Sequence, residues 1–274
     1  MLSRREVIDL LGAHGLAPRR SLGQNFVVDP NTVRRIARLS GVGPGDQVVE
    51  IGAGLGSLTL ALAETGASVT AVEIDRGIVP LLRSIVEPVG VHVVEGDALG
   101  LDWGRLVGGG ARDAPSWHLV ANLPYNVATP LVVTLLEDVP AIRRMLVMVQ
   151  AEVGERLAAR PGDPLYGSVS VQVAYWAEAR VVGRVPPTVF VPRPNVESSL
   201  VAIDRRAEPS VDPALVAYAR LKTVVRTGFA QRRKMLRRSL AGVVDAARFE
   251  ACGIAPEARA EDLDVIEWGR LAAW

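Results

Sequence analysis

The sequence predicts an α/β fold in which a mainly parallel, seven-stranded sheet is covered on both faces by helices and is followed by a small all-helical domain. Three observations indicate this. Up to about residue 204, short apolar runs alternate with segments of helical periodicity. Glycine or polar residues follow successive apolar runs, as at the strand ends of such sheets. After Pro209 and Pro213 only helical periodicity remains. We therefore expect two domains, residues 1–204 and 205–274.

The expected elements follow one another in a regular order. Residues 4–12 form a helix, and a basic loop leads to Asp29, which caps a second helix that starts with Pro30. A glycine-rich loop is expected at 108–113. The expected strands are 47–51, 68–74, 91–94, 117–121, 145–149, 181–185 and 199–203, the last two as a pair along one sheet edge. The helices between them are 57–64, 77–86, 129–136, 150–160 and 168–176. The C-terminal helices are 213–226, 231–241, 245–251 and 262–272.

Composition places the chain among ordinary globular proteins. It has 274 residues, of which 49% are hydrophobic and 22% charged. The single cysteine, Cys252, excludes an internal disulfide framework and a cysteine-based metal cluster. The uncharged run 114–136 is long enough to span a bilayer, but its three prolines and two asparagines favour a strand, a loop and a helix. We expect a cytoplasmic protein without a secretion signal, a metal or a membrane contact. The sequence does not determine the oligomeric state, and a monomer is the expectation.

Charge is distributed unevenly along the chain. The net charge is +1, but residues 205–274 hold 13 Lys or Arg against 9 Asp or Glu. Within this part, one segment without acidic residues contains Arg226, Arg232, Arg233, Lys234, Arg237 and Arg238. Cations on a helical face suit contacts to nucleic-acid phosphates. The alternative is an ordinary solvated helix face.

A glycine loop joins the first predicted strand to its helix. The sequence Gly52-Ala53-Gly54-Leu55-Gly56 allows the backbone to approach a ligand, with helix amides directed toward an acceptor. The spacing G-x-G-x-G is one residue shorter than the dinucleotide fingerprint G-x-G-x-x-G. The alternative is a tight turn without a ligand.

Two acidic residues end the next two strands. Glu73 is suited to accept hydrogen bonds from ribose hydroxyls, and Asp97 from an adenine amine. Taken singly, Glu73 is better explained as a solvated carboxylate and Asp97 as a turn residue. The neighbouring Asp75 is explained as a solvated carboxylate or as the cap of the following helix. Because Gly52, Glu73, Asp97 and the later Asn122 follow four successive strands, we expect them at one end of one sheet.

The segment Asn122-Leu123-Pro124-Tyr125-Asn126 combines an amide, a backbone carbonyl, a rigid turn and an aromatic ring directly after a strand. Pro124 cannot extend a central strand, so the chain leaves the sheet there. The combination is suited to holding a flat ring that carries an amine. The alternative is an ordinary strand-ending turn.

These residues give the chain a resemblance to the ribosomal RNA adenine N6,N6-dimethyltransferases, a family of Rossmann-like S-adenosylmethionine-dependent methyltransferases. The matching motifs occur in order between about residues 18 and 272: Leu22-Gly23-Gln24-Asn25-Phe26, Glu50-Ile51-Gly52-x-Gly54, Glu73-Ile74-Asp75, Gly96-Asp97-Ala98, Asn122-Leu123-Pro124-Tyr125-Asn126, Phe190-x-Pro192-x-Pro194-x-Val196-x-Ser198 and Phe229-x-Gln231-Arg232-Arg233-Lys234. The chain departs from the family pattern at Val27, where leucine is common, and at Asn195, where lysine is common. The second departure removes a positive charge near the RNA side.

The resemblance implies a methyltransferase domain over residues 1–204 and an RNA-binding domain over 205–274. It implies that S-adenosylmethionine is held by Asn25, Val27 (through its backbone), Gly52, Gly54, Glu73, Ile74, Asp97, Ala98 and Asn122. It also implies the substrate, two adjacent adenines in a hairpin near the 3′ end of 16S rRNA within the immature 30S subunit. Each adenine would be dimethylated at N6 during ribosome biogenesis.

The residues themselves suggest how such a reaction would proceed. The Asn122 oxygen and a backbone carbonyl at Leu123 or Pro124 would hold the hydrogens of the adenine amine. Tyr125 would stack on one face of the base and Phe190 on the other, as aromatic residues do with extruded bases. For Phe190 alone, a core position is the alternative. No strong base is required before attack, so positioning and electrostatics would carry catalysis.

Three other functions remain open at this point. One is the related 23S rRNA adenine dimethyltransferase that confers macrolide resistance. A second is a ribosome-assembly factor without catalytic activity, and a third is a dinucleotide-dependent oxidoreductase.

Overall fold

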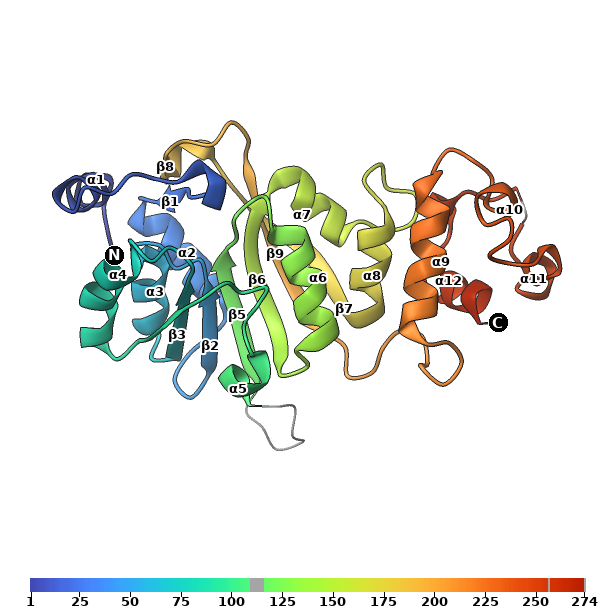
Figure 1. Cartoon of the computed structure of the whole chain (residues 1–274), viewed down its shortest axis with the longest axis horizontal. Helices are drawn as coiled ribbons and strands as arrows, with labels where there is room; N and C mark the ends of the chain where they lie inside the picture. Colours follow the sequence, from blue (N-terminus) through green and yellow to red (C-terminus); the bar gives the residue numbers. More distant parts are fainter. Residues whose placement is uncertain (109–115, 256, 274) are drawn as a thin grey trace. The chain divides into compact units, whose positions relative to one another are not determined.

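The protein folds into two compact units. The computed structural model describes residues 1–108, 116–255 and 257–273, so most of the predicted loop 108–113 lies outside the described residues. Met1–Gly154 and Arg180–Asp204 form the first unit. Glu155–Ala179 and Arg205–Trp274 form the second (Figure 1). The predicted boundary near Asp204 is one of the points where the chain passes between the units, but the sequence did not indicate that Glu155–Ala179 packs with the C-terminal helices.

The first unit contains the predicted seven-stranded sheet. Its order is β4-β3-β2-β5-β6-β9-β7. The pairs β4–β3, β3–β2, β2–β5 and β5–β6 are parallel, whereas β9 is antiparallel to β6. The strands are β2 Gln47–Ile51, β3 Ser68–Glu73, β4 His92–Glu95, β5 Trp117–Asn122, β6 Ile142–Gln150, β7 Ala177–Val185 and β9 Ser198–Arg205.

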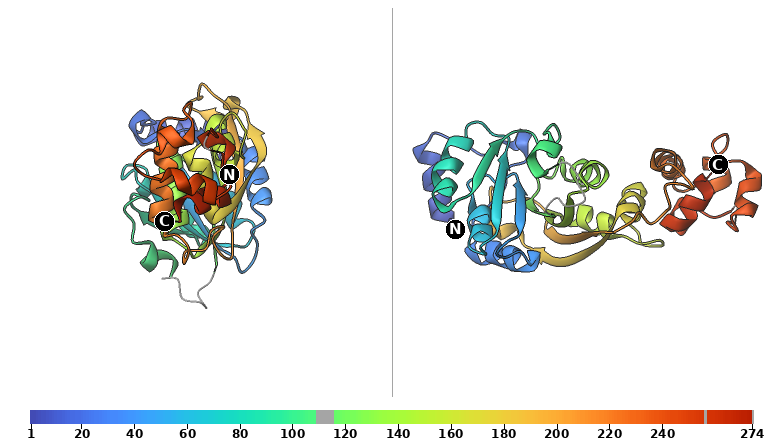
Figure 2. Two further views of the ribbon diagram at one scale, coloured as in Figure 1. Left: turned by 90° about the vertical axis from the view of Figure 1, so that its right-hand side faces the viewer. Right: turned by 90° about the horizontal axis from the view of Figure 1, so that it is seen from below.

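Helices cover both faces of this sheet (Figures 1 and 2). The helices of the first unit are α1 Arg4–Ala13, α2 Pro30–Ser40, α3 Ser57–Ala63, α4 Val79–Val86, α5 Trp103–Val107 and α6 Ala128–Asp138. Helix α7, Ala151–Ala158, begins in the first unit and ends in the second. As predicted, Asp29 caps α2, accepting from the amides of Asn31 and Thr32. Helix α5 was not predicted. It is only five residues long, which is too short for a helical period to be visible in the sequence.

Alternation along the strands separates two apolar layers. Val48, Ala71 and Val120 belong to the core cluster that also contains residues of α2, α3 and α4. Their neighbours Val49 and Leu119 are equally buried and, by the two-residue period of a strand, face the opposite side of the sheet. Glu50, Glu73 and Asn122 share the parity of Val48, Ala71 and Val120, so the strands direct all three toward the same face at the carboxyl edge.

A separate two-stranded sheet covers part of the first unit. Strand β1, Phe26–Val27, pairs antiparallel with β8, Phe190–Val191, in the register Phe26↔Val191 and Val27↔Phe190. Phe190 has 0% of its surface exposed and belongs to the core. The prediction that Phe190 stacks on a base is therefore not supported by this conformation, because the β1–β8 pairing places its ring in the interior.

The second unit is helical. It consists of α8 Ser168–Trp176, α9 Tyr218–Ala230, α10 Leu236–Ser239, α11 Ala246–Ala251 and α12 Val265–Ala272, around a core that includes Tyr175, Leu221 and Trp268. The prediction of one helix over 231–241 is wrong. Met235 is extended (φ −59°, ψ 143°) and pairs with Arg259, so the helix begins only after it and has four residues.

Short 3₁₀ segments occur in both units. They are Arg20–Leu22, Glu87–Val89 and Pro187–Val189 in the first unit and Ala260–Asp262 in the second.

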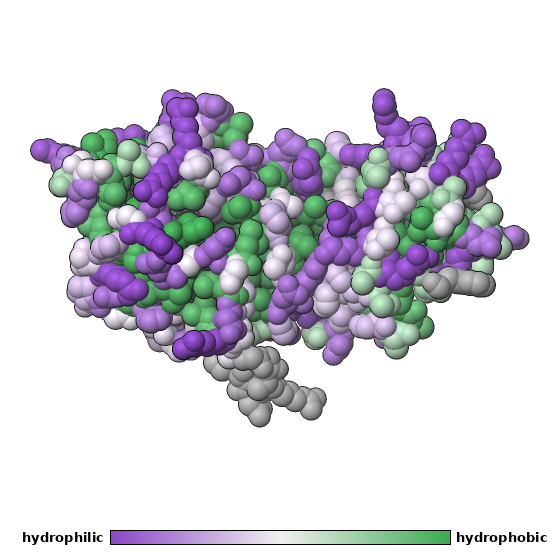
Figure 3. Space-filling model, viewed as in Figure 1, coloured by the Kyte–Doolittle hydropathy of each residue, from purple (hydrophilic) through white to green (hydrophobic). Residues whose placement is uncertain are grey.

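The surface mixes polar and apolar side chains. On the face shown in Figure 3, hydrophilic residues surround smaller hydrophobic areas. Within the described ranges, no helix has the length and apolar character needed to cross a membrane.

Candidate active site

Two adjoining cavities lie at the carboxyl edge of the sheet in the first unit. The first has a volume of about 70 Å³ and the second about 110 Å³. They share Leu22, Gly52, Ile74 and Pro124. The structure brings all nine residues that were predicted to hold a cofactor to these cavities. Asn25, Val27, Gly52, Gly54, Glu73, Ile74 and Asn122 line the first. Gly52, Ile74, Asp97 and Ala98 line the second.

The glycine loop is shaped for close approach of a ligand. Gly52, Gly54 and Gly56 have φ values of 72°, 57° and 84°, a region that favours glycine. A Cβ atom at Gly54 would lie 2.9 Å from the Phe26 ring. Any side chain at Gly54 would therefore be strained and would also collide with the opposite wall of the cavity.

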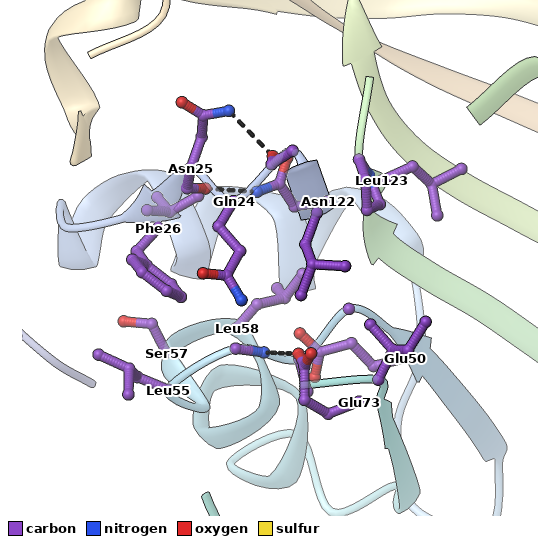
Figure 4. A pocket seen from close by; sticks show the side chains of 18 of the residues that line it. Gln24, Asn25, Phe26, Glu50, Leu55, Ser57, Leu58, Glu73, Asn122 and Leu123 are labelled. Atoms are coloured by element: carbon purple, nitrogen blue, oxygen red, sulfur yellow. Dashed lines mark hydrogen bonds between the residues drawn. The ribbon is translucent and has the colours of Figure 1, made fainter. Parts of the chain in front are cut away.

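Two backbone amides hold the carboxylate of Glu73. Its Oε2 accepts from the Gly54 amide at 2.7 Å (Figure 4). Its Oε1 accepts from the Asp75 amide at 2.9 Å. Burial raises the pKa of Glu73, while these two hydrogen bonds oppose the shift. Each carboxylate oxygen retains a second lone pair, so Glu73 can still accept from a pair of hydroxyl groups.

The second cavity offers apolar walls beside a carboxylate. Ile74 and Leu99 line it and are unusually exposed for large apolar residues, at 43% and 44%. Asp97 Oδ1 accepts from the Leu99 amide at 3.0 Å, which fixes the orientation of the carboxylate. A flat aromatic ring with an exocyclic amine fits this combination, with its faces against the apolar side chains and its amine toward Asp97.

Asn122 is oriented by a hydrogen bond to the backbone. Its Nδ2 donates to the Asn25 carbonyl at 3.0 Å (Figure 4). Because a carbonyl can only accept, this bond identifies the nitrogen, and Oδ1 is the remaining acceptor of the side chain. Asn122 and its three successors, Leu123, Pro124 and Tyr125, all line the first cavity, as predicted for the catalytic segment.

The backbone carbonyls after Asn122 are not equivalent. The Pro124 carbonyl accepts from the amides of Val127 and Ala128, at 3.1 and 3.0 Å, where the chain enters α6. Both of its lone pairs are thus in use. Of the two carbonyls considered from the sequence, Leu123 is therefore the better second acceptor for an amine.

Tyr125 is half-buried and fixed at its hydroxyl end. The hydroxyl lies 2.9 Å from Ser198 Oγ, and Ser198 is completely buried. Burial raises the pKa of Tyr125, so the ring is neutral near pH 7. A neutral ring anchored at its edge is suited to stacking on a base.

Glu50 is a residue of the site whose role the sequence does not indicate beyond its place in the glycine motif. It lies beside Glu73 in the wall of the first cavity (Figure 4) and is 2% exposed. Burial is the main cause that raises its pKa to about 8; the Thr59 hydroxyl opposes this shift, and the charge of Glu73 adds to it. Its Oε2 has no hydrogen bond of good geometry among the described residues. A positive charge on a bound ligand would favour the ionised form of this carboxyl.

The basic segment of the second unit (Arg226, Arg232, Arg233, Lys234, Arg237 and Arg238) does not form one helical face. It runs from α9 through a turn into α10. Arg232 pairs with Glu261 and Arg237 with Glu257, at 2.5 and 3.4 Å. The segment remains a predicted RNA contact.

In the described part of the chain, no three His, Cys, Asp or Glu side chains are grouped to hold a metal.

Comparison with known proteins places this site in a family. The family model described as ribosomal RNA adenine dimethylase matches residues 15–274, nearly the whole chain. The chain belongs to the ribosomal RNA adenine dimethylase family. The fold and the resemblance predicted from the sequence are thereby confirmed, and the chain is an enzyme of the methyltransferase class.

Members of the dimethylase family with curated names resemble the chain over its full length. A protein of Leifsonia xyli subsp. xyli, named ribosomal RNA small subunit methyltransferase A, is 45% identical, covering 100% of this chain and 98% of its own. A protein of Streptomyces coelicolor with the same name is 46% identical, covering 99% and 96%.

Solved structures of dimethylases have the same fold. The 23S rRNA methyltransferase ErmE is 28% identical with a TM-score of 0.68, covering 90% of this chain and 98% of its own. A dimethyladenosine transferase from Plasmodium falciparum is 22% identical with a TM-score of 0.71, covering 89% and 94%.

Proposed function

We propose that this protein transfers methyl groups from S-adenosylmethionine to N6 of two adjacent adenines in a hairpin near the 3′ end of 16S rRNA, giving N6,N6-dimethyladenines. The observation that carries the proposal is the orientation of Asn122. Its amide nitrogen is committed to the Asn25 carbonyl, which leaves an acceptor for an amine at the mouth of the first cavity. The substrate would be rRNA in an immature small subunit, and the enzyme a cytoplasmic monomer.

The two cavities fit the proposed cofactor in chemistry. The second cavity suits its adenine, with Asp97 toward the amine and Ile74 and Leu99 against the faces. The first cavity offers Glu73 for the ribose hydroxyls and the unpaired Glu50 oxygen on the side of the positively charged groups. When bound, S-adenosylmethionine supplies a methyl group already activated by its sulfonium.

The residues of the protein would act by positioning the base. An adenine amine is a weak nucleophile because its lone pair is delocalised into the ring. If Asn122 Oδ1 and the Leu123 carbonyl accept its two hydrogens, the nitrogen becomes more pyramidal and its lone pair is directed outward. The ring of Tyr125 would stack on one face of the adenine. Fixed acceptors of this kind lower the barrier without a strong base, and the proton leaves after transfer.

The comparisons favour a small-subunit substrate over the 23S alternative. The relatives named for the small subunit are 45% and 46% identical over nearly their full lengths, whereas ErmE is 28% identical. Basic residues of the second unit would contact rRNA phosphates, which position the substrate without reading bases.

The test is transfer of labelled methyl groups into ribosomal subunits from a strain that lacks the modification. We expect label in 30S particles and none in 50S particles. Because dimethyladenine blocks reverse transcriptase, primer extension on both rRNAs should stop at the first modified adenine near the 3′ end of 16S rRNA. Mapping of the labelled nucleotides should then show label in two adjacent adenines. Label confined to 23S rRNA would select the macrolide-resistance activity, and no label in either particle would indicate an assembly factor without catalysis.

A further inference from the structure

One segment of the first unit covers both cavities. Residues 19–27, here called the strap, contribute six consecutive residues to the first cavity, Leu22 to Val27, and Leu22 to the second as well. The strap contains only one 3₁₀ turn and the two-residue strand β1. The backbone hydrogen bonds of its first part are local, from the amides of residues 22–24 to the carbonyls of Arg19 and Arg20, and its last two residues pair with β8. Side-chain contacts therefore connect the first part of the strap to the rim of the sheet.

Asp75 provides those contacts from the turn after β3. Its Oδ1 pairs with Arg19 Nη1 at 3.1 Å, and its Oδ2 accepts from Gln24 Nε2 at 2.8 Å. Gln24 Oε1 in turn accepts from the Arg19 amide at 2.7 Å. Asp75 is 3% exposed, and its Oδ1 also accepts from the Gly77 amide. A buried carboxylate thus joins both ends of a six-residue stretch of the strap to the rim of the sheet.

The interpretation of Asp75 as a helix cap does not account for these contacts. The N-cap of α4 is Ile78, and no side chain caps it. The carboxylate is instead used by Gly77 and by two residues that lie 51 and 56 positions earlier in the chain.

The same strap holds the catalytic side chain. Asn25 lies next to Gln24 and presents the carbonyl that accepts from Asn122 Nδ2. Gly23 approaches the segment after Asn122, since a Cβ atom there would be 3.0 Å from Asn126 Oδ1 and 3.2 Å from Pro124. The position of the strap therefore determines whether Asn122 keeps its donor occupied and its acceptor free.

The strap is held against the glycine loop in this structure, a position that we call closed. The Phe26 ring of the strap lies so near Gly54 that a Cβ atom there would be 2.9 Å from it. A ligand that approaches the glycine loop at Gly54 would therefore have to displace Phe26, and with it the strap, away from Asp75.

We propose that Asp75 is a positioning residue that holds the strap closed through Arg19 and Gln24, and so controls both the passage of S-adenosylmethionine and the orientation of Asn122. This inference rests on the proposed function. It adds a role for a buried carboxylate that lines neither cavity. Opening of the strap would precede cofactor entry, and closure would complete the acceptor site for the amine.

The test compares Asp75→Asn with Arg19→Met, which removes the same ion pair from the more exposed side. Arg76→Gln is the matched control, since Arg76 is the next residue and its ion pair, with Glu95 at 3.2 Å, lies on the surface. Stopped-flow measurements with S-adenosylhomocysteine give association and dissociation rates. We expect both rates to rise, dissociation by about tenfold to a hundredfold, the range for losing a charged hydrogen bond. Because the free protein is also closed, the equilibrium constant should change less than either rate.

A second readout follows the strap itself. Trypsin cleaves after arginine, and Arg19 and Arg20 lie in the strap. Mass spectrometry should show faster cleavage at these residues in Asp75→Asn, and after Arg20 in Arg19→Met, with protection restored by S-adenosylhomocysteine. Cleavage after Arg5, outside the strap, provides an internal reference.

The outcomes separate the two proposals. If the wild type binds S-adenosylhomocysteine but both variants match Arg76→Gln in rates and cleavage, Asp75 does not hold the strap. Weaker binding with unchanged or slower association would also overturn the inference, because it would show damage to the site without release of a closed segment. If the wild type does not bind S-adenosylhomocysteine, the proposed function itself fails.

Discussion

Replacing Glu50 with glutamine should change how stability depends on pH. Burial raises the pKa of Glu50 from 4.5 to about 8. Between these values the folded protein keeps a proton that the unfolded chain releases. The contribution of Glu50 to stability is therefore full below about pH 4.5 and is lost as pH rises toward 8. At about 1.4 kcal/mol per pH unit, the free energy of unfolding decreases by at most about 5 kcal/mol over this interval.

Glutamine has the shape of the protonated side chain and does not titrate. The difference in unfolding free energy between Glu50→Gln and the wild type should therefore grow as pH rises from 5 to 9, by several kcal/mol in favour of the variant. Urea unfolding followed by circular dichroism at each pH measures it. The pKa of Glu73 is also raised, so some pH dependence remains in both proteins and cancels in the comparison.

Glu95→Gln is the control for this experiment, because Glu95 ends β4, two strands away from β2, and 44% of its side chain is exposed. Any change in its difference from the wild type over the same range should be much smaller than that of Glu50→Gln. If Glu50→Gln also differed from the wild type by the same amount at pH 5 and pH 9, the buried carboxyl would not keep its proton near neutrality, and the conclusion that burial raises its pKa would be wrong.

Three further predictions concern the site and the basic segment. Gly54→Ala should abolish detectable S-adenosylhomocysteine binding in calorimetry, because the new Cβ meets the Phe26 ring at a backbone angle that favours glycine; binding within threefold of the wild type would contradict this. Tyr125→Ala should reduce the rate of methyl transfer by about tenfold to a hundredfold, because ~1–3 kcal/mol of stacking is lost. Tyr125→Phe lacks only the bond to Ser198, and its rate should fall less than tenfold. An equal fall in rate for both variants would exclude stacking. Glutamine at residues 232–234 should weaken rRNA binding and lower the salt slope by about 1 to 3 in filter binding, with cofactor affinity unchanged; an unchanged slope would remove these residues from the RNA contact.

The grouping of Gly52, Glu73, Asp97 and Asn122 could be predicted because each of them is local to a strand end. They end an apolar strand or follow it within two residues, and parallel strands bring their carboxyl ends to one edge. Periodicity and turn residues were sufficient to locate the strands, and the topology then brought the four residues together.

The parts that were missed depend on contacts between distant segments. Strands β1 and β8 have two residues each, too few for a period, so the burial of Phe190 by their pairing left no signal in the sequence. The bonds of Asp75 to the strap join residues more than 50 positions apart. Likewise, Met235 leaves the helical conformation because it pairs with Arg259, which no local pattern around residue 235 records.

The most direct test of the central claim is single-turnover methyl transfer by Asn122→Ala to immature 30S subunits. The cofactor is kept at a concentration that saturates the variant, as verified by calorimetry, so that any loss reflects the reaction and not cofactor binding. Removing one fixed partner of the reacting group typically slows a reaction by about 10²- to 10³-fold. We expect a decrease of this size, with binding of the subunit changed by less than threefold. A rate within threefold of the wild type would show that Asn122 does not hold the adenine amine.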